Sequence, residues 1–393
     1  MGYDALRNRW SILAVLFTVR LSMAFQFQSV AAVAPLLGTK FGVSIADIGI
    51  LIGLYFTPGV ALSLPGGAIG KKFGDKATVT LALLLMLIGE CVILASDSWS
   101  WQIAGRLIAG GGGVLLNVLM SKMVTDWFAG REIATAMAIF VNSWPAGLAI
   151  ALLTLPAIGT AYGLSAVYLA VATLIVLGIV LLAVGYPAPS AVTSATAVAA
   201  SRLERHALIA LVVASLIWGV FNIGFAMIFS FGPTMLVERG WSITAAGSAI
   251  SIVLWLAALS GFAGGFLSDW TKRPQLVLAG GCVLFALLML ALPRSTAVIP
   301  IVVAIGAISA MPSGPIMSLP ARVLQPDTRA IGMGIFYTVY YGAMMLGTAL
   351  AGAIAKSTGS AAAAFDFGAV MLLACPLLLI GFNRIVAPRT QPA

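Results

Sequence analysis

Twelve long apolar stretches decide what this chain can fold into. Each is about 20 residues or longer, which is the length of helix that crosses the roughly 30 Å hydrocarbon core of a bilayer. Only 8% of the 393 residues are charged, whereas a typical soluble domain has about 25%. The sequence therefore predicts an all-α membrane protein with transmembrane helices at 10–37, 46–69, 77–96, 101–123, 133–156, 162–186, 207–236, 242–268, 275–293, 297–320, 330–355 and 361–386.

The basic residues are distributed unevenly between the two sets of connecting loops. If the N-terminus is inside, the outer loops hold only Lys40, Arg239, Arg294 and Lys356. Cytoplasmic loops of membrane proteins carry such an excess of Lys and Arg. We therefore expect an integral multi-pass protein of the cell (inner) membrane with both termini in the cytoplasm. The net charge of +9 is then a consequence of topology, and no nucleic-acid partner is expected.

Two pairs of similar segments indicate an internal duplication. "GAIGKKFGDK" (67–76) is similar to "GFLSDWTKRP" (265–274), and "ATAMAIF" (134–140) is similar to "AIGMGIF" (330–336). The members of each pair lie about half the chain length apart. Internal symmetry of this kind is expected of transporters.

The repeat divides the chain into three parts. We predict two pseudo-symmetric six-helix bundles, at residues 1–186 and 207–393. The segment 187–206 between them is rich in small residues and closes with basic ones, which is typical of a flexible linker. Two bundles joined in this way can rock against each other.

These features together resemble the major facilitator superfamily over essentially the whole chain. The motif of that family between helices 2 and 3, G-x-x-x-D-[RK]-x-G-[RK]-[RK], is matched at Gly67, Lys72, Gly74 and Lys76, while Lys71 replaces the aspartate. The resemblance implies two six-helix bundles and transport by alternating access. It also implies that this loop contributes to the cytoplasmic gate.

Two further segments carry the same resemblance. The second copy of the loop motif keeps an acidic residue, Asp269, followed by Lys272 and Arg273. The helix 4 motif of the family, R-x-x-x-G-x-G, is matched by Arg106 and the glycines after it. The resemblance therefore implies that Lys72, Asp269 and Arg273 act in gating, and Arg106 is a candidate for gating or coupling through pairing with Glu90.

One arginine, Arg20, lies in the middle of the first apolar stretch. At 1.5 Å per residue from Trp10, it is about 15 Å deep, near the bilayer midplane. A charge at that depth costs at least a few kcal/mol, so it must face a cavity or a partner. Either Arg20 pairs with Glu90 or another carboxylate, or its planar fork of donors binds an anionic substrate.

Other polar and aromatic side chains inside the predicted helices are candidates for the same cavity. Aromatic residues at helical spacing are more often packing residues than ligand contacts. Hydroxyl and amide groups within a membrane nevertheless need partners. Besides Arg20, the predicted substrate-binding residues are Phe27, Gln28, Asn142, Trp144, Trp218, Asn222, Tyr337 and Tyr341.

Glu90 and Arg106 lie on neighbouring predicted helices in the outer half of the membrane. They form either a structural ion pair, or a coupling pair in which Glu90 accepts a proton during transport. "GGGG" (110–113) and "MPSGPIMSLP" (311–320) occupy corresponding helices of the two halves. Such segments mark either broken helices at a midplane site or close packing of helices.

The function favoured by these residues is secondary active transport of a small organic or inorganic anion, monocarboxylate- or cyanate-like. The chain loosely resembles the cyanate permease-like branch of small-anion porters, which also has an arginine in helix 1. The expected partners are a small anionic substrate, with or without a co-transported proton as in a symporter, and the lipid bilayer. We expect a monomer with no cofactor, no metal and no catalytic residue.

Three alternatives remain open at this point. The first is a proton-driven exporter of hydrophobic or drug-like compounds, in which Arg20 is structural. The second, a membrane-embedded enzyme, is disfavoured because the sequence has no H-E-x-x-H motif and its single histidine, His206, lies in the predicted linker. The third is a transporter-like sensor without flux.

Overall fold

The computed structural model describes residues 3–63, 65–128, 133–186, 204–325 and 328–386. The regular structure in these ranges consists of α-helices and two short 3-10 helices, and the ranges contain no strand. They hold twelve spans long and apolar enough to cross a membrane, which confirms the predicted number. Large apolar side chains such as Phe266 and Leu377 are exposed on the outer surface, as expected where lipid surrounds the protein.

The first six spans are here called the N-half. Their described residues form ten helices, because some spans are broken. Breaks precede Pro35, Pro58 and Pro65, since proline has no N–H to continue a helix. The helices are α1 (Tyr3–Ala32), α2 (Ala34–Phe41), α3 (Ile45–Leu54), α4 (Thr57–Leu62), α5 (Gly66–Phe73), α6 (Asp75–Leu94), α7 (Trp99–Phe128), α8 (Ile133–Val141), α9 (Ser143–Tyr162) and α10 (Leu164–Gly185).

The last six spans, here called the C-half, include one broken span at "MPSGPIMSLP". Residues 187–203 of the predicted linker lie outside the described residues, and Arg205 and His206 belong to a helix rather than to the linker. The helices are α11 (Arg205–Glu238), α12 (Ile243–Thr271), α13 (Pro274–Ala291), η1 (Leu292–Arg294), α14 (Val298–Ser309), α15 (Ser313–Met317), η2 (Pro320–Arg322), α16 (Arg329–Thr358) and α17 (Ala362–Val386).

The glycine run in α7 has a packing role. A Cβ at Gly110 would lie 2.3 Å from the carbonyl oxygen of Tyr55, and one at Gly112 would lie 2.3 Å from that of Ala82. The glycines therefore let α3 and α6 approach α7 closely. An interruption matching that of the tenth span is absent here, because α7 is one continuous helix.

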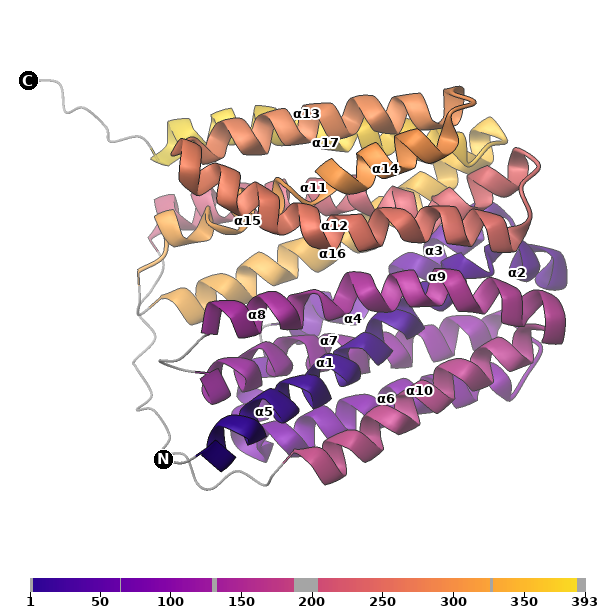
Figure 1. Cartoon of the computed structure of the whole chain (residues 1–393), viewed down its shortest axis with the longest axis horizontal. Coiled ribbons are helices and arrows are strands. Elements are labelled where there is room, and N and C mark those ends of the chain that lie inside the picture. Colours follow the sequence, from indigo (N-terminus) through magenta and orange to yellow (C-terminus); the bar gives the residue numbers. More distant parts are fainter. Residues whose placement is uncertain (1–2, 64, 129–132, 187–203, 326–327, 387–393) are drawn as a thin grey trace, which may run out of the picture.

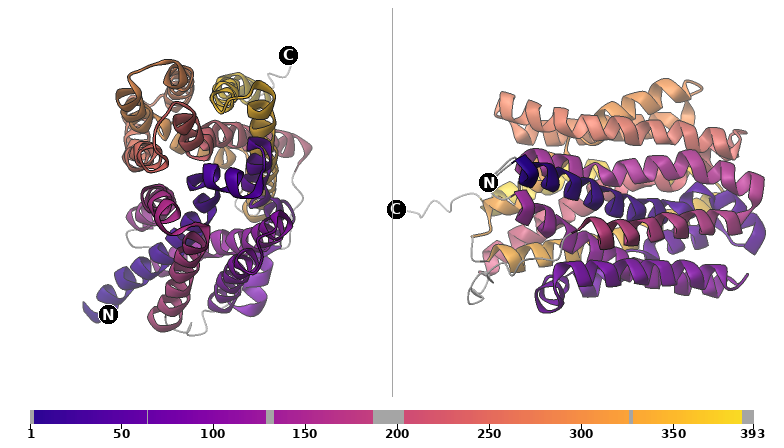
Figure 2. Two further views of the ribbon diagram at one scale, coloured as in Figure 1. Left: turned by 90° about the vertical axis from the view of Figure 1, so that its right-hand side faces the viewer. Right: turned by 60° about the horizontal axis from the view of Figure 1, so that its bottom comes forward.

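The helices run side by side along the long axis of the molecule, with most of the C-half above most of the N-half in Figure 1. The end at which α1 begins and α17 ends is called the terminal side, and the opposite end is called the far side. Figure 2 shows the bundle from the far side in its left-hand view. The N-half and C-half meet where α16 packs on α3 and α4, α12 on α9, and α11 on α1.

Main-chain contacts join the two halves near the far side. A Cβ at Gly352 of α16 would lie 3.0 Å from the Cα of Gly49 in α3, and one at Gly247 of α12 would lie 2.3 Å from the carbonyl oxygen of Leu152 in α9. Only glycine permits helices to touch so closely. We call these two contacts the far-side seam.

Candidate functional site

A cavity of about 1050 Å³ lies between the two halves. Its lining extends toward the terminal side, since it includes Ser121 of α7, Phe262 of α12, Met317 of α15 and Ile331 near the start of α16. The far-side seam joins the halves at the other end. The cavity is therefore directed toward the terminal side.

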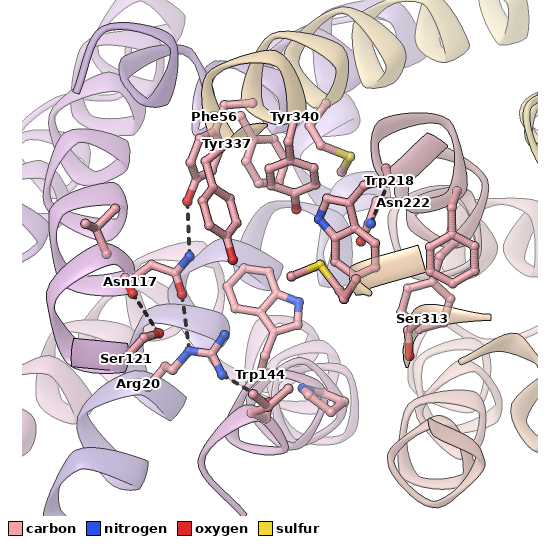
Figure 3. Close-up of a pocket in the computed structure, with 18 of the residues that line it drawn as sticks. Arg20, Phe56, Asn117, Ser121, Trp144, Trp218, Asn222, Ser313, Tyr337 and Tyr340 are labelled. Atoms are coloured by element: carbon pink, nitrogen blue, oxygen red, sulfur yellow. Dashed lines mark hydrogen bonds between the residues drawn. The ribbon is translucent and has the colours of Figure 1, made fainter. Parts of the chain in front are cut away.

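Arg20 projects from α1 into this cavity, beside Trp144 (Figure 3). Its Nε donates to Oδ1 of Asn117 at 3.3 Å. Its Nη1 donates to the carbonyl oxygens of Phe140 and Val141, both at 3.1 Å. The guanidinium also lies 4.8 Å from the centre of the Phe140 ring. These contacts fix the guanidinium without neutralising its charge.

No carboxylate pairs with Arg20 within the described ranges. The predicted alternative of an ion pair between Arg20 and Glu90 is therefore wrong. The Glu90 carboxylate accepts a hydrogen bond from Gln26 instead. Arg20 is the one charged side chain among the described residues that line the cavity. Its Nη2 donates no hydrogen bond to any of them.

Asn117 connects Arg20 to the opposite half of the molecule. Its amide oxygen accepts from Arg20, and its Nδ2 donates to the Tyr341 hydroxyl of α16 at 3.1 Å. Figure 3 shows both bonds as dashed lines. Sequence analysis did not identify Asn117, although an amide inside a predicted span was a usable signal. The Arg20–Asn117–Tyr341 bridge thus places one polar contact between the halves inside the cavity.

The wall contributed by the C-half is rich in aromatic side chains. Trp218 and Asn222 come from α11, while Tyr337, Tyr340 and Tyr341 come from α16. The Asn222 amide donates to the Trp218 carbonyl oxygen at 2.7 Å. Tyr337 and Tyr340, labelled in Figure 3, have hydroxyl groups without a hydrogen-bond partner among the described residues. They remain free for a bound molecule.

Phe27 and Gln28, which were expected in the cavity wall, lie behind it instead. Phe27 is 1% exposed and packs on Trp144 at 5.4 Å and on Phe56 at 5.0 Å, measured between ring centres. Gln28 is fully buried and donates to the carbonyl oxygen of Phe229 at 2.6 Å. Both residues therefore support the wall or join the halves.

The other predicted binding residues all line the cavity, although their role in binding stays a prediction. They are Arg20, Asn142, Trp144, Trp218, Asn222, Tyr337 and Tyr341. Several neighbouring lining residues were not predicted, because a helical face cannot be assigned to a cavity before the packing of the helices is known. The missed lining residues include Tyr55, Phe56, Asn117, Ser121, Phe229 and Ser313.

Arg106 and Glu90 form no direct salt bridge and do not line the cavity. Arg106 is 2% exposed, and it donates to the carbonyl oxygens of Gln26 at 3.0 Å, Phe27 at 2.5 Å and Leu51 at 3.3 Å. The Gln26 amide in turn donates to Glu90 Oε2 at 2.8 Å. Gln26 therefore lies between the two charged groups, in a buried network that joins α1, α3, α6 and α7.

The predicted gate residues lie at the terminal side. Lys72 is exposed and Arg273 precedes α13, and neither forms a salt bridge with a described residue. The side chain of Asp269 lies outside those that the structure describes. The ion pairs found on this side join Lys122 to Asp75 at 2.5 Å and to Asp126 at 3.0 Å.

Comparison with known proteins gives a consistent result. A family model described as Major Facilitator Superfamily matches residues 16–348. Inner membrane transport protein YajR of Escherichia coli (strain K12) is 30% identical over 140 residues, covering 36% of this chain and 30% of that protein. Nitrate/nitrite transporter NrtP of Picosynechococcus sp. is 28% identical over 113 residues, covering 27% and 20%. Choline/ethanolamine transporter FLVCR2 of Homo sapiens is 26% identical over 153 residues, covering 38% and 29%.

Solved structures match over nearly the whole chain. The D-xylose-proton symporter superimposes with a TM-score of 0.79 at 15% identity, covering 95% of this chain and 98% of the other. A bacterial homolog of the human lysosomal transporter Spinster, in an inward-facing and unoccupied conformation, gives 0.73 at 17% identity, covering 98% and 97%. These matches establish the fold, whereas the sequence matches reach less than a third of each curated relative named above.

Proposed function

Because the chain belongs to the major facilitator superfamily of transporters, we propose that it moves an anion across the membrane by alternating access. The observation that carries this proposal is the Arg20 guanidinium, which lines the cavity without a described carboxylate partner. A guanidinium in a membrane interior is costly unless its charge is compensated. An anion at the free Nη2 supplies that compensation, and the similarity to a nitrate/nitrite transporter supports the same choice.

The cavity is less suited to the other classes of substrate. A cation such as choline would bind beside Arg20 with no carboxylate among the described lining residues to attract it. A neutral hydrophobic compound, the substrate class of an exporter, would leave the arginine without a counter-ion. Electrostatic complementarity therefore favours an anion.

The bridge from Arg20 to Tyr341 suggests how binding is coupled to movement. Asn117 accepts from the guanidinium on the N-half and donates to the tyrosine hydroxyl on the C-half. An anion that binds Nη2 and Nε of Arg20 together competes with Asn117 for Nε. Occupancy then changes the contact between the halves and biases their equilibrium. The loop charges predict that both termini lie in the cytoplasm of a cell with an inner membrane. We therefore propose that the cavity, which is directed toward the terminal side, belongs to an inward-facing state and that the carrier works as a monomer.

Replacing Arg20 with glutamine should weaken anion binding. We expect a small monocarboxylate to stabilise the wild-type protein thermally, while its neutral amide analogue does not. Hydrogen bonds to charged groups contribute about 1.5–3 kcal/mol, so Arg20→Gln should weaken binding roughly 10–100-fold. Calorimetric titration of the purified protein measures this difference.

Arg294→Gln is the matched control, since Arg294 is exposed and paired with Asp366 at 2.7 Å, outside the cavity lining. It should bind the carboxylate as the wild type does. Equal stabilisation by the acid and by its amide, in wild type and Arg20→Gln alike, would contradict the proposal and support a hydrophobic exporter.

Glu90 is the coupling residue that we propose, because its buried Oε1 lacks a partner among the described residues. Glu90→Gln keeps the side-chain volume and removes the titrating group. We expect exchange of substrate across liposomes to continue, while accumulation driven by a proton gradient is lost. Accumulation at the wild-type rate in Glu90→Gln would assign the residue a structural role alone.

A further inference from the structure

We propose that the transported anion is amphipathic, with one carboxylate and a flat aromatic body, rather than an inorganic ion. This inference rests on the proposed function and specifies the substrate class of the same site. It follows from the surface that faces the cavity beyond Arg20.

The aromatic side chains form a continuous surface across the cavity. Tyr340 lies 6.2 Å from Trp218 and 6.3 Å from Tyr337, measured between ring centres. Tyr337 lies 6.4 Å from Tyr341, which lies 6.2 Å from Phe56 of the N-half. Ring centres 4.5–7 Å apart are in the range of favourable aromatic contact. The surface therefore runs from Trp218 on α11, across the tyrosines of α16, to Phe56 of the N-half.

This surface separates charge from apolar area within one cavity. The guanidinium and Asn117 stand at one end, joined to Tyr341 by hydrogen bonds. Trp218 stacks on Phe221 at 5.8 Å in the opposite half, and Phe225 lines the wall nearby. A ligand that satisfies both ends carries a negative group at one end and an apolar body at the other.

The polar atoms left along the surface are few and uncharged. The hydroxyls of Tyr337 and Tyr340 have no hydrogen-bond partner among the described residues, and the Asn222 amide donates one of its two N–H groups to the Trp218 carbonyl oxygen. Figure 3 shows Tyr337, Tyr340 and Asn222 among the labelled lining residues, with Trp144 between Arg20 and Trp218 in this view. They fit a ring that carries a hydroxyl or a ring nitrogen better than a second charge.

The size of the cavity points in the same direction. Its volume of about 1050 Å³ is at the upper end of the roughly 300–1,000 Å³ range of pockets for drug-sized ligands. An ion of a few atoms held at Nη2 would leave the aromatic surface in contact with water. Burying a ring on that surface removes apolar area from water, which should raise affinity about 10–100-fold.

The test compares ligands that share one carboxylate and differ in body. We expect the affinity of the purified full-length protein, measured by calorimetric titration, to rise about 10–100-fold from acetate to benzoate and indole-3-acetate. Trp218→Leu should weaken indole-3-acetate about 10-fold and leave acetate unchanged. Trp255→Leu is the matched control, because Trp255 is 44% exposed on α12 and outside the lining.

The outcomes separate this inference from the proposed function. The proposal of an aromatic substrate is refuted by two results together. Acetate and nitrate would bind as tightly as indole-3-acetate, and Trp218→Leu would leave the affinity for indole-3-acetate unchanged. The anion proposal survives that result provided that Arg20→Gln weakens acetate. If Arg20→Gln binds indole-3-acetate and its neutral amide as the wild type does, the anion proposal itself fails. If Trp218→Leu does not fold, the affinity of Phe225→Leu for indole-3-acetate is measured in its place. The ligand series on the wild-type protein tests the proposal without any variant.

Discussion

Arg106→Met should lower the midpoint of thermal unfolding by roughly 5–10 °C. Arg106 is buried and donates three hydrogen bonds to main-chain oxygens, at Gln26, Phe27 and Leu51. It also lies 4.5 Å from the centre of the Tyr55 ring. Charge-assisted bonds contribute about 1.5–3 kcal/mol each but are not additive. Removing one partner from a buried charged network typically costs about 3–5 kcal/mol, and we expect a loss of that size.

A second substitution and a control define the cause. Arg106→Lys should recover little stability, because an ammonium group cannot match the planar fork that spans three carbonyls. Arg239 also bonds two carbonyl oxygens, at Leu292 and Ser295, but it is exposed. Arg239→Met should therefore shift the midpoint much less. Equal shifts for Arg106→Met and Arg239→Met would show that the buried network does not hold the N-half together.

Gly352→Val should abolish transport by opening the far side. A Cβ at Gly352 would lie 3.0 Å from Gly49 Cα and 3.1 Å from the Ala46 carbonyl oxygen. Main-chain atoms cannot move aside as a side chain can, so the seam cannot close around valine. We expect the population to shift to the state open on the far side and uptake to fall about 100-fold.

Distances between spin labels can follow this shift. A pair at Thr39 and Ser357, both exposed toward the far side, should move apart in Gly352→Val. A pair at Thr125 and Ala321 on the terminal side should move together. Gly280→Val is the control, because a Cβ there meets nothing within 4 Å. Unchanged distances in a folded, inactive Gly352→Val would refute the role of the seam.

The number and positions of the spans could be predicted because bilayer thickness sets a length that the sequence shows directly. The depth of Arg20 followed from the same count. What could not be predicted was which residues of one helical face meet the cavity. Phe27 lies two turns after Arg20 on α1. At that level the two halves are in contact, so the Phe27 ring packs on other rings instead of facing the cavity. Trp144, which packs on Phe27, lines the cavity.

The partners of the charged groups were also beyond the sequence. The adjacent positions of their helices suggested that Glu90 and Arg106 would form an ion pair. Instead, the Arg106 guanidinium donates to three main-chain oxygens. Asn117 was overlooked beside the glycine run of the same helix, although its two bonds connect the halves. Hydrogen bonds to carbonyl groups leave no signature in residue type, because every residue has a carbonyl.

The far-side seam has a consequence for the rate of transport. It is built from main-chain contacts at Gly49, Gly352 and Gly247, so no side-chain rotation can open it. Opening requires whole helices to separate and displace the lipid that surrounds them. The rate of the return step should therefore depend on the fluidity and lateral pressure of the bilayer, and stiffer lipid should slow the cycle even when the cavity is saturated.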